Sequence, residues 1–168
     1  LRPQIQSIFI EHSGEVSRQL KSTKIASTNE DKDVYIADYP LLPVRRRFWR
    51  SVLNSTDNSG TAAQMRTQLR VTHEAVKSVA NRELGAVIPG DFLYDQLASN
   101  LVVTGEMQKR FQEIIEEQSE KPDGELRRRV CATVFMINKL PTGITSIGVV
   151  ANDEHISDLL AHDLEGSA

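Results

Sequence analysis

Apolar residues recur at helical spacing between positions 61 and 79. Met65, Leu69, Thr72, Val76 and Val79 are separated by four, three, four and three positions, and this spacing places side chains on one face of an α-helix. We predict a helix over 61–79 that buries this stripe. Aromatic residues make up only 5% of the chain. A core must therefore be built mainly from Leu, Val, Ile and Ala, which favours packed helices over stacked sheets.

The same spacing predicts helices in much of the remaining chain. The expected segments are 43–53, 92–101, 107–115, 126–137 and a last one ending at 160. Pro43 suits the first turn of its helix because an N–H is not needed there. Asn152 or Asp153 can cap the last helix. The fold class is therefore mainly α.

Other segments predict loops or short strands. Residues 1–20 carry a weaker helical pattern, interrupted near Ser13-Gly14, and the polar residues 21–33 read as a loop. Residues 34–36 fit a short strand or a packed connector, and the β-branched run 147–150 fits a short strand. Helix, strand and helix at the C-terminus would begin a winged-helix pattern. A truncated three-helix unit describes this region equally well.

The net charge of −3 conceals an uneven distribution. Residues 39–82 hold 8 basic and 2 acidic groups, whereas 83–168 hold 7 basic and 15 acidic groups. A basic middle between less basic flanks indicates a local anionic partner.

The strongest functional pattern lies on the predicted helix 61–79. Arg66, Arg70, His73 and Lys77 are spaced four, three and four positions apart, so they share one face. A second basic cluster precedes it at Arg45, Arg46, Arg47 and Arg50. Together these cations could present forked donors to phosphate oxygens. The alternative is an ordinary solvated helix surface with scattered salt bridges.

Two further features have plainer interpretations. Arg127, Arg128 and Arg129 point in three directions on a helix, so a surface role is expected, with contacts to a nucleic-acid backbone as the alternative. Trp49 and Phe48 lie at apolar positions and are interpreted as core or as an interface with a neighbouring domain.

The search for a self-contained catalytic site is negative. The sequence has no G-x-x-x-x-G-K-[ST] loop and no G-x-S-x-G elbow. His155 and His162 lack a third ligand for a metal, and Cys131 is expected to be a buried, inert thiol. We expect no enzyme, metal site or bound cofactor in this chain.

No apolar run reaches the ~18 residues that span a membrane, so a cytoplasmic location is expected. The chain begins at Leu1, which suggests a fragment of a longer protein.

Two strings carry a resemblance to a known family. The residues YPLLPVRRRFW at 39–49, together with GTAAQMRTQLR at 60–70 and HEAV at 73–76, resemble BrxC/PglY, the large ATPases of bacterial BREX phage-defence systems. The resemblance is sharpest over 38–100, continues more loosely through 126–160, and is faint before 38.

The resemblance implies an architecture and a role. Members look like AAA+ ATPases of the origin-recognition type, in which a helical lid and winged-helix-like domains follow the nucleotide domain. It implies that residues 1–38 end a preceding domain or form a linker, 39–121 form the lid, and 122–168 begin a winged-helix-like unit, with the boundary at the turn Pro122-Asp123-Gly124. The parent protein would bind ATP and Mg²⁺ through upstream residues.

The same resemblance implies site residues and partners. A lid of this kind commonly offers an arginine to the γ-phosphate after a Gly-small-small start. Here 60–63 is Gly-Thr-Ala-Ala, so Arg66, with Arg70 behind it, is the substitute. The implied partners are other BREX subunits, the rest of the same chain, double-stranded DNA, or further copies through the ATPase domain. The alternatives are a nucleic-acid-binding helical module, or a protein-interaction scaffold that uses Trp49 and the acidic segment 106–125.

Overall fold

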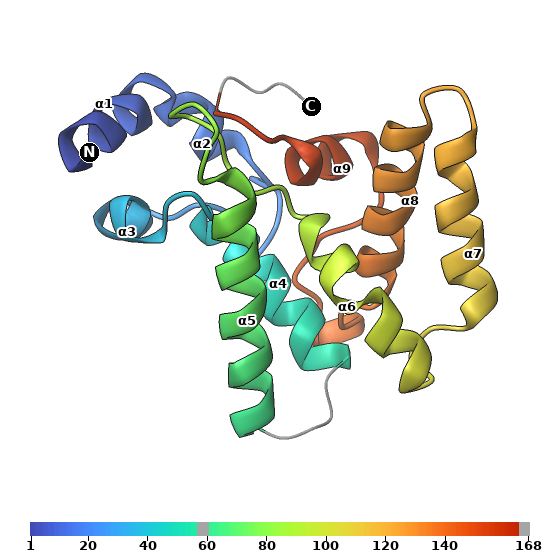
Figure 1. The fold of residues 1–168 in the computed structure, drawn as a ribbon. Helices are drawn as coiled ribbons and strands as arrows, with labels where there is room; N and C mark the ends of the chain where they lie inside the picture. Colours follow the sequence, from blue (N-terminus) through green and yellow to red (C-terminus); the bar gives the residue numbers. More distant parts are fainter. Residues whose placement is uncertain (57–60, 165–168) are drawn as a thin grey trace.

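Helices form nearly all the regular structure of this chain. The computed structural model describes residues 1–56 and 61–164 (Figure 1). The α-helices of these residues are α1 (Arg2–Glu11), α2 (Ser13–Arg18), α3 (Asp31–Asp38), α4 (Pro43–Thr56), α5 (Thr61–Val79), α6 (Phe92–Val103), α7 (Lys109–Glu117), α8 (Gly124–Asn138) and α9 (Asp153–Leu160). Short 3₁₀ turns lie at η1 (Gln118–Glu120) and η2 (Gly143–Thr145). The prediction of a mainly α fold is confirmed.

Several predicted helix ends match the structure. The first residue of α4 is Pro43, and α5 spans the predicted 61–79. At the start of α9 the side-chain oxygen of Asn152 accepts a hydrogen bond from the backbone N–H of His155, at 2.8 Å. Asn152 is therefore the N-cap, which satisfies one of the unpaired amides at the helix start.

The two strand predictions are wrong. Residues 34–36 lie within α3, and 147–150 are an irregular connector between η2 and α9. Within 1–56 and 61–164 the only β-pairing is an isolated antiparallel bridge between Ala86 and Asp163. The connector 147–150 has no neighbouring strand. Instead, the backbone N–H of Lys24 donates to the carbonyl of Ile147 at 2.9 Å. The winged-helix unit therefore stays a prediction, without its expected strand.

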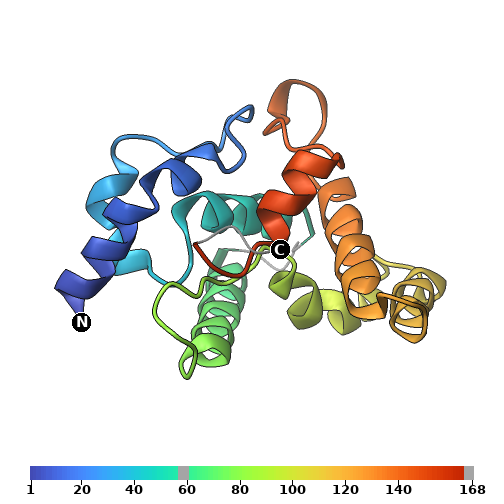
Figure 2. The same cartoon turned by 90° about the horizontal axis from the view of Figure 1, so that it is seen from above.

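The helices pack around α4, which lies in the middle of the molecule. In Figures 1 and 2, α1 and α3 lie on one side of α4, while α6, α8 and α9 lie on the other. Helix α5 stands beside α4, and α7 lies at the edge outside α8 (Figure 1). Apolar side chains from both sides of Pro122, including Leu101 and Met136, belong to one core cluster. The proposed domain boundary at 121/122 stays a prediction.

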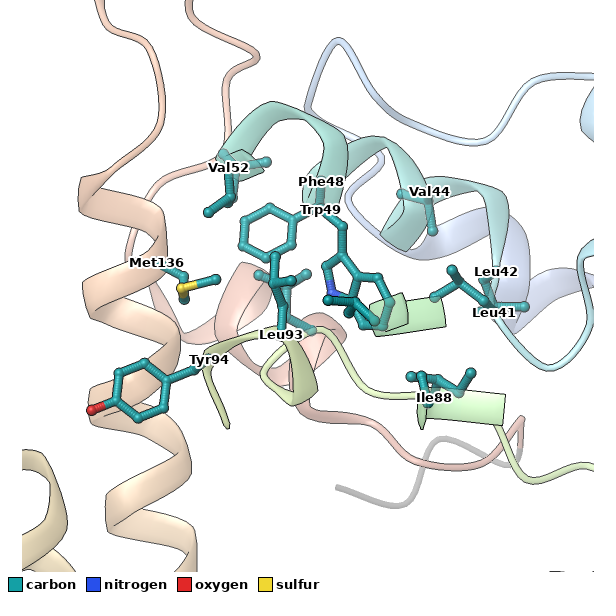
Figure 3. Close-up of a cluster of buried hydrophobic side chains, with 14 of the residues drawn as sticks. Leu41, Leu42, Val44, Phe48, Trp49, Val52, Ile88, Leu93, Tyr94 and Met136 are labelled. Carbon is teal, nitrogen blue, oxygen red and sulfur yellow. The ribbon is translucent and has the colours of Figure 1, made fainter. Parts of the chain in front are cut away.

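The centre of the core combines side chains of α4, α6 and α8. Phe48 and Val52 from α4, Leu93 from α6 and Met136 from α8 are all buried and face one another (Figure 3). Because α4 and α6 are fixed by this packing, the surface that α4 and α5 present together rests on a well-packed base.

Tyr94 carries a polar group into this core. Its side chain is buried, and its hydroxyl has no hydrogen-bond partner in the described part of the chain. Burial is also the main cause that raises the pKa of Tyr94 to about 12. An unpaired buried hydroxyl loses its hydrogen bonds to water without replacement.

Replacement of Tyr94 by phenylalanine is therefore expected to leave the free energy of unfolding unchanged or to raise it by about 1 kcal/mol. Urea denaturation measures the effect. Tyr35→Phe is the matched control, since the Tyr35 hydroxyl shares a 2.5 Å hydrogen bond with Ser27 and its removal should cost about 1 kcal/mol. Equal losses in the two variants would mean that the Tyr94 hydroxyl has a partner.

Candidate functional site

The four cations predicted on one face of α5 do lie at the surface. Arg66, Arg70, His73 and Lys77 are all exposed, and they lie on α5, which stands beside α4 (Figure 1). Their spacing over a helix that the structure confirms places them in one row. We call these four residues the basic row. It is the part of the predicted site that the structure keeps together.

The apolar stripe of α5 is not buried as predicted. Met65, Leu69 and Val76 have 59%, 66% and 41% of their surface exposed. Among the α5 residues whose side chains the structure describes, 65–79, those buried are Val71 and Ala75. Helix α5 packs on α4 and α6 through this second set. Met65, Leu69 and Val76 of the predicted stripe are therefore turned toward solvent, where they border the basic row, whereas Thr72 and Val79 are half-buried.

The angular order of these faces follows from helix geometry. Each residue of an α-helix advances by about 100° around the axis, because a turn holds about 3.6 residues. Leu69 and Arg70 are thus about a quarter of a turn apart. The exposed apolar stripe therefore lies between the core-facing side of α5 and the basic row. This arrangement gives α5 an outward surface that is both apolar and cationic.

Two arginines of the α4 cluster form hydrogen bonds and a salt bridge within the molecule. Arg45 was predicted at the surface, but its side chain is fully buried. It donates to the backbone carbonyls of Ile88 and Asp158 at 2.7 and 3.2 Å. Arg47 forms a salt bridge with Asp31 at 2.5 Å and also donates to the carbonyls of 25 and 26. Neither guanidinium is available to an external anion.

The other two α4 arginines are exposed. Arg46 pairs with Asp38 at 3.0 Å, and Arg50 lies one turn further along the helix. Burial raises the pKa of Asp38, and the Arg46 charge lowers it in part. Arg46 is thus partly neutralised, and Arg50 is the more accessible cation of this helix.

Arg45 keeps its charge in spite of its burial. Desolvation lowers its pKa to about 10, and the carboxylates of Asp91 and Asp158 act in the opposite direction. A pKa of about 10 leaves Arg45 protonated at neutral pH. It serves as a buried cation that fixes backbone carbonyls between α4 and α9.

The arginines at the start of α8 also differ from the surface role expected of them. Arg129 forms a two-bond contact with Asp91, at 2.8 and 2.9 Å, and donates to the carbonyl of Leu160. Arg128 bridges Asp95 and Glu116. Only Arg127 remains exposed, with a bond to the carbonyl of residue 122. Arg128 and Arg129 therefore connect α8 to its neighbours.

Phe48 and Trp49 are core residues. Phe48 is fully buried, and Trp49 has 4% of its surface exposed. The indole N–H of Trp49 donates to the carbonyl of Gly90 at 2.8 Å, and its ring stacks on Phe92. Of the two interpretations of Trp49, these contacts fit a position in the core.

A groove runs between α4 and α5 beside the basic row. It has a volume of about 230 Å³. Its walls include Trp49, Leu53, Met65 and Leu69, with Arg46 and Arg50 at the α4 side. The exposed apolar stripe of α5 is one wall of this groove, so the two surface features form one continuous region.

His155 and Cys131 have different surroundings in the structure. His155 is buried, with Nε2 2.9 Å from the Ser22 hydroxyl and Nδ1 in contact with the backbone of Val150. His162 follows the end of α9, so the two histidines do not share a helical face. No three-residue group suited to a metal was found in the parts of the chain that the structure describes. Cys131 is half-buried and lines a different groove, between α7 and α8.

Sequence reasoning missed the buried role of Arg45 and the contact between Ser22 and His155. A signal for the first was present, because Arg45, Phe48, Trp49 and Val52 follow helical spacing and share one face. The contact between Ser22 and His155 joins residues 133 positions apart, so no local sequence pattern predicts it.

The predicted Gly-small-small start of the lid helix includes Gly60, which lies outside the described residues. No helix within 1–56 and 61–164 combines the length and apolar character needed to cross a lipid bilayer. No protein-family model, curated protein or solved structure matches the chain.

Proposed function

We propose that this chain is the helical lid and linker of a bacterial anti-phage ATPase of the BREX type, working in the cytoplasm. Its role is to couple the nucleotide state of the parent protein to the engagement of a partner subunit or DNA. The observation that carries the proposal is the outward position of Arg66 and Arg70, one turn apart on α5. The strings that resemble BrxC/PglY form α4 and α5, the two helices that present this surface.

The proposed mechanism depends on a charge-assisted hydrogen bond. ATP and Mg²⁺ belong to an upstream domain of the parent protein, which the resemblance implies. A guanidinium presents planar, forked donors that match the oxygens of a phosphate. When an arginine of α5 contacts a γ-phosphate, the helix is held against the nucleotide domain. Hydrolysis removes this contact, and the orientation of the lid relaxes.

The packing of α5 suits such a coupling role. Val71 and Ala75 are buried, and α5 packs on α4 and α6. A movement of α5 is therefore passed to these neighbours, because a close-packed core deforms little. From α6 the contact continues to α8, where the predicted winged-helix-like unit begins.

Arg66→Ala in the full-length parent protein is expected to slow ATP turnover by about 10- to 100-fold, since one preorganised donor to a developing charge typically contributes at least that much. Arg127→Ala is the control, because Arg127 is an exposed arginine on a different face. Circular dichroism and thermal unfolding should be unchanged in both variants. Normal turnover in Arg66→Ala and in Arg70→Ala would reject the sensing role of α5.

The basic row also supports a second function, direct binding of a nucleic-acid backbone. That function predicts that the isolated chain binds duplex DNA, with log K falling against log salt at a slope of about −0.9 for each phosphate neutralised. Arg70→Ala should reduce the slope by about one unit. Absence of binding at low salt in a fluorescence anisotropy assay would exclude this second function for the chain.

A further inference from the structure

The groove between α4 and α5 has the form of a helix-docking site. One wall is the exposed apolar stripe of α5, with Met65 and Leu69 at 59% and 66% exposure. The floor includes the buried side chains of Trp49, Leu53 and Val71. Exposed apolar side chains beside a preformed apolar floor are a surface that a partner can cover with little rearrangement.

The charges at this groove have one sign. The charged residues that line it are Arg46 and Arg50. The carboxylate of Asp38 partly neutralises Arg46, so Arg50 is the main cation of the groove. An occupant with apolar groups in its middle and carboxylates on the flank that faces α4 would complement both features.

The dimensions favour a helix as that occupant. A volume of about 230 Å³ is below the range of about 300–1,000 Å³ that is usual for small-molecule pockets. It suffices for a few apolar side chains. The apolar positions of α5 follow i, i+4 and i+11 spacing at Met65, Leu69 and Val76, over roughly three helical turns. A second helix laid along α5 can therefore be contacted along its length.

We propose that the α4–α5 groove binds an acidic amphipathic helix of a partner protein. Apolar side chains of that helix fill the space between Leu53 and Leu69, and its acidic residues pair with Arg50. This inference needs no nucleotide and stands apart from the sensing role of α5. A different groove, between α7 and α8, offers no such preference, because its charged lining residues Glu106 and Lys139 pair with each other.

Selection from a peptide library tests the proposal directly. The library displays 18-residue helices with leucine fixed at helical spacing and all other positions random, and the bait is the 168-residue chain. Enriched peptides are expected to carry an excess of Glu and Asp on one flank of the leucine stripe, the flank that faces α4. Their affinity is then measured by fluorescence anisotropy against variants of the chain.

Two variants probe the groove, and one serves as the matched control. Leu69→Gln and Arg50→Glu should each weaken the selected peptides about tenfold or more, in the manner of central interface residues. Both positions are exposed, so folding should be retained. Phe111→Gln, on the exposed face of the α7–α8 groove, should leave affinity unchanged. A peptide with its acidic residues changed to lysine should bind Arg50→Glu better than it binds the original chain.

Four results would overturn the proposal. These are failure to enrich any binder, enrichment of neutral or basic sequences, equal sensitivity to Phe111→Gln and Leu69→Gln, and self-association of the chain that Leu69→Gln abolishes. None of these results bears on ATP turnover in Arg66→Ala, so the two proposals can fail separately.

Discussion

Replacement of Arg45 by alanine is expected to lower the free energy of unfolding by about 3–5 kcal/mol, the range seen when one member of a buried charge network is removed. Arg45 is fully buried and donates to the carbonyls of Ile88 and Asp158. The carboxylates of Asp91 and Asp158 also act on its charge. Alanine would leave two buried carbonyls without this donor and a cavity where the long side chain lay.

Urea denaturation at neutral pH measures this loss, and two further variants separate its causes. Arg45→Met keeps most of the volume and removes the donors, so its loss should lie between that of Arg45→Ala and zero. Arg46→Ala is the neighbouring control, because Arg46 is exposed and paired only with Asp38 at the surface. It should cost less than about 1 kcal/mol. Comparable losses at positions 45 and 46 would contradict the buried role of Arg45.

Much of the fold could be predicted because its helices are local. The period of apolar residues and the residues at helix ends, Pro43 and Asn152, placed α4, α5 and α9 close to their observed bounds. The strand at 147–150 failed because a strand needs a neighbour to pair with, and β-branched composition alone does not supply one. Local composition also could not show that residues 34–36 belong to α3.

The orientation of α5 could not be predicted from its own residues. Apolar side chains occur at Met65, Leu69, Val71, Ala75 and Val76, which covers a wide arc of the helix. Spacing shows that such an arc exists, but the neighbouring helices decide which part of it is buried. Here α4 and α6 cover Val71 and Ala75, and this choice creates the exposed stripe and the groove.

The separate roles of the arginines depend on tertiary contacts. Arg45, Arg46 and Arg47 are adjacent in sequence, yet one is buried, one is exposed and one is held by Asp31. A count of charges does not distinguish the three arginines. Their directions around the helix do, and the burial of Arg45 could have been predicted because it shares a helical face with Phe48 and Trp49. The basic row on α5 could be predicted because it requires only helical spacing and an uncovered face.

The interior position of Trp49 leads to an expected loss of about 3–5 kcal/mol in Trp49→Ala, as is usual for truncation of a large aromatic core residue. Trp49 is 4% exposed, stacks on Phe92 and donates to the carbonyl of Gly90. Alanine removes the packing and the donor together, whereas Trp49→Phe removes the donor and keeps most of the packing, so its loss should be clearly smaller.

Urea denaturation followed by far-UV circular dichroism measures both. A Trp49→Ala variant that unfolds at the same urea concentration as the original chain and only loses a binding partner would show that Trp49 is an interface residue after all. Because Trp49 also forms part of the floor between α4 and α5, the Trp49→Phe variant should retain most of its affinity for an acidic helix, which ties the stability of this core to the surface that it supports.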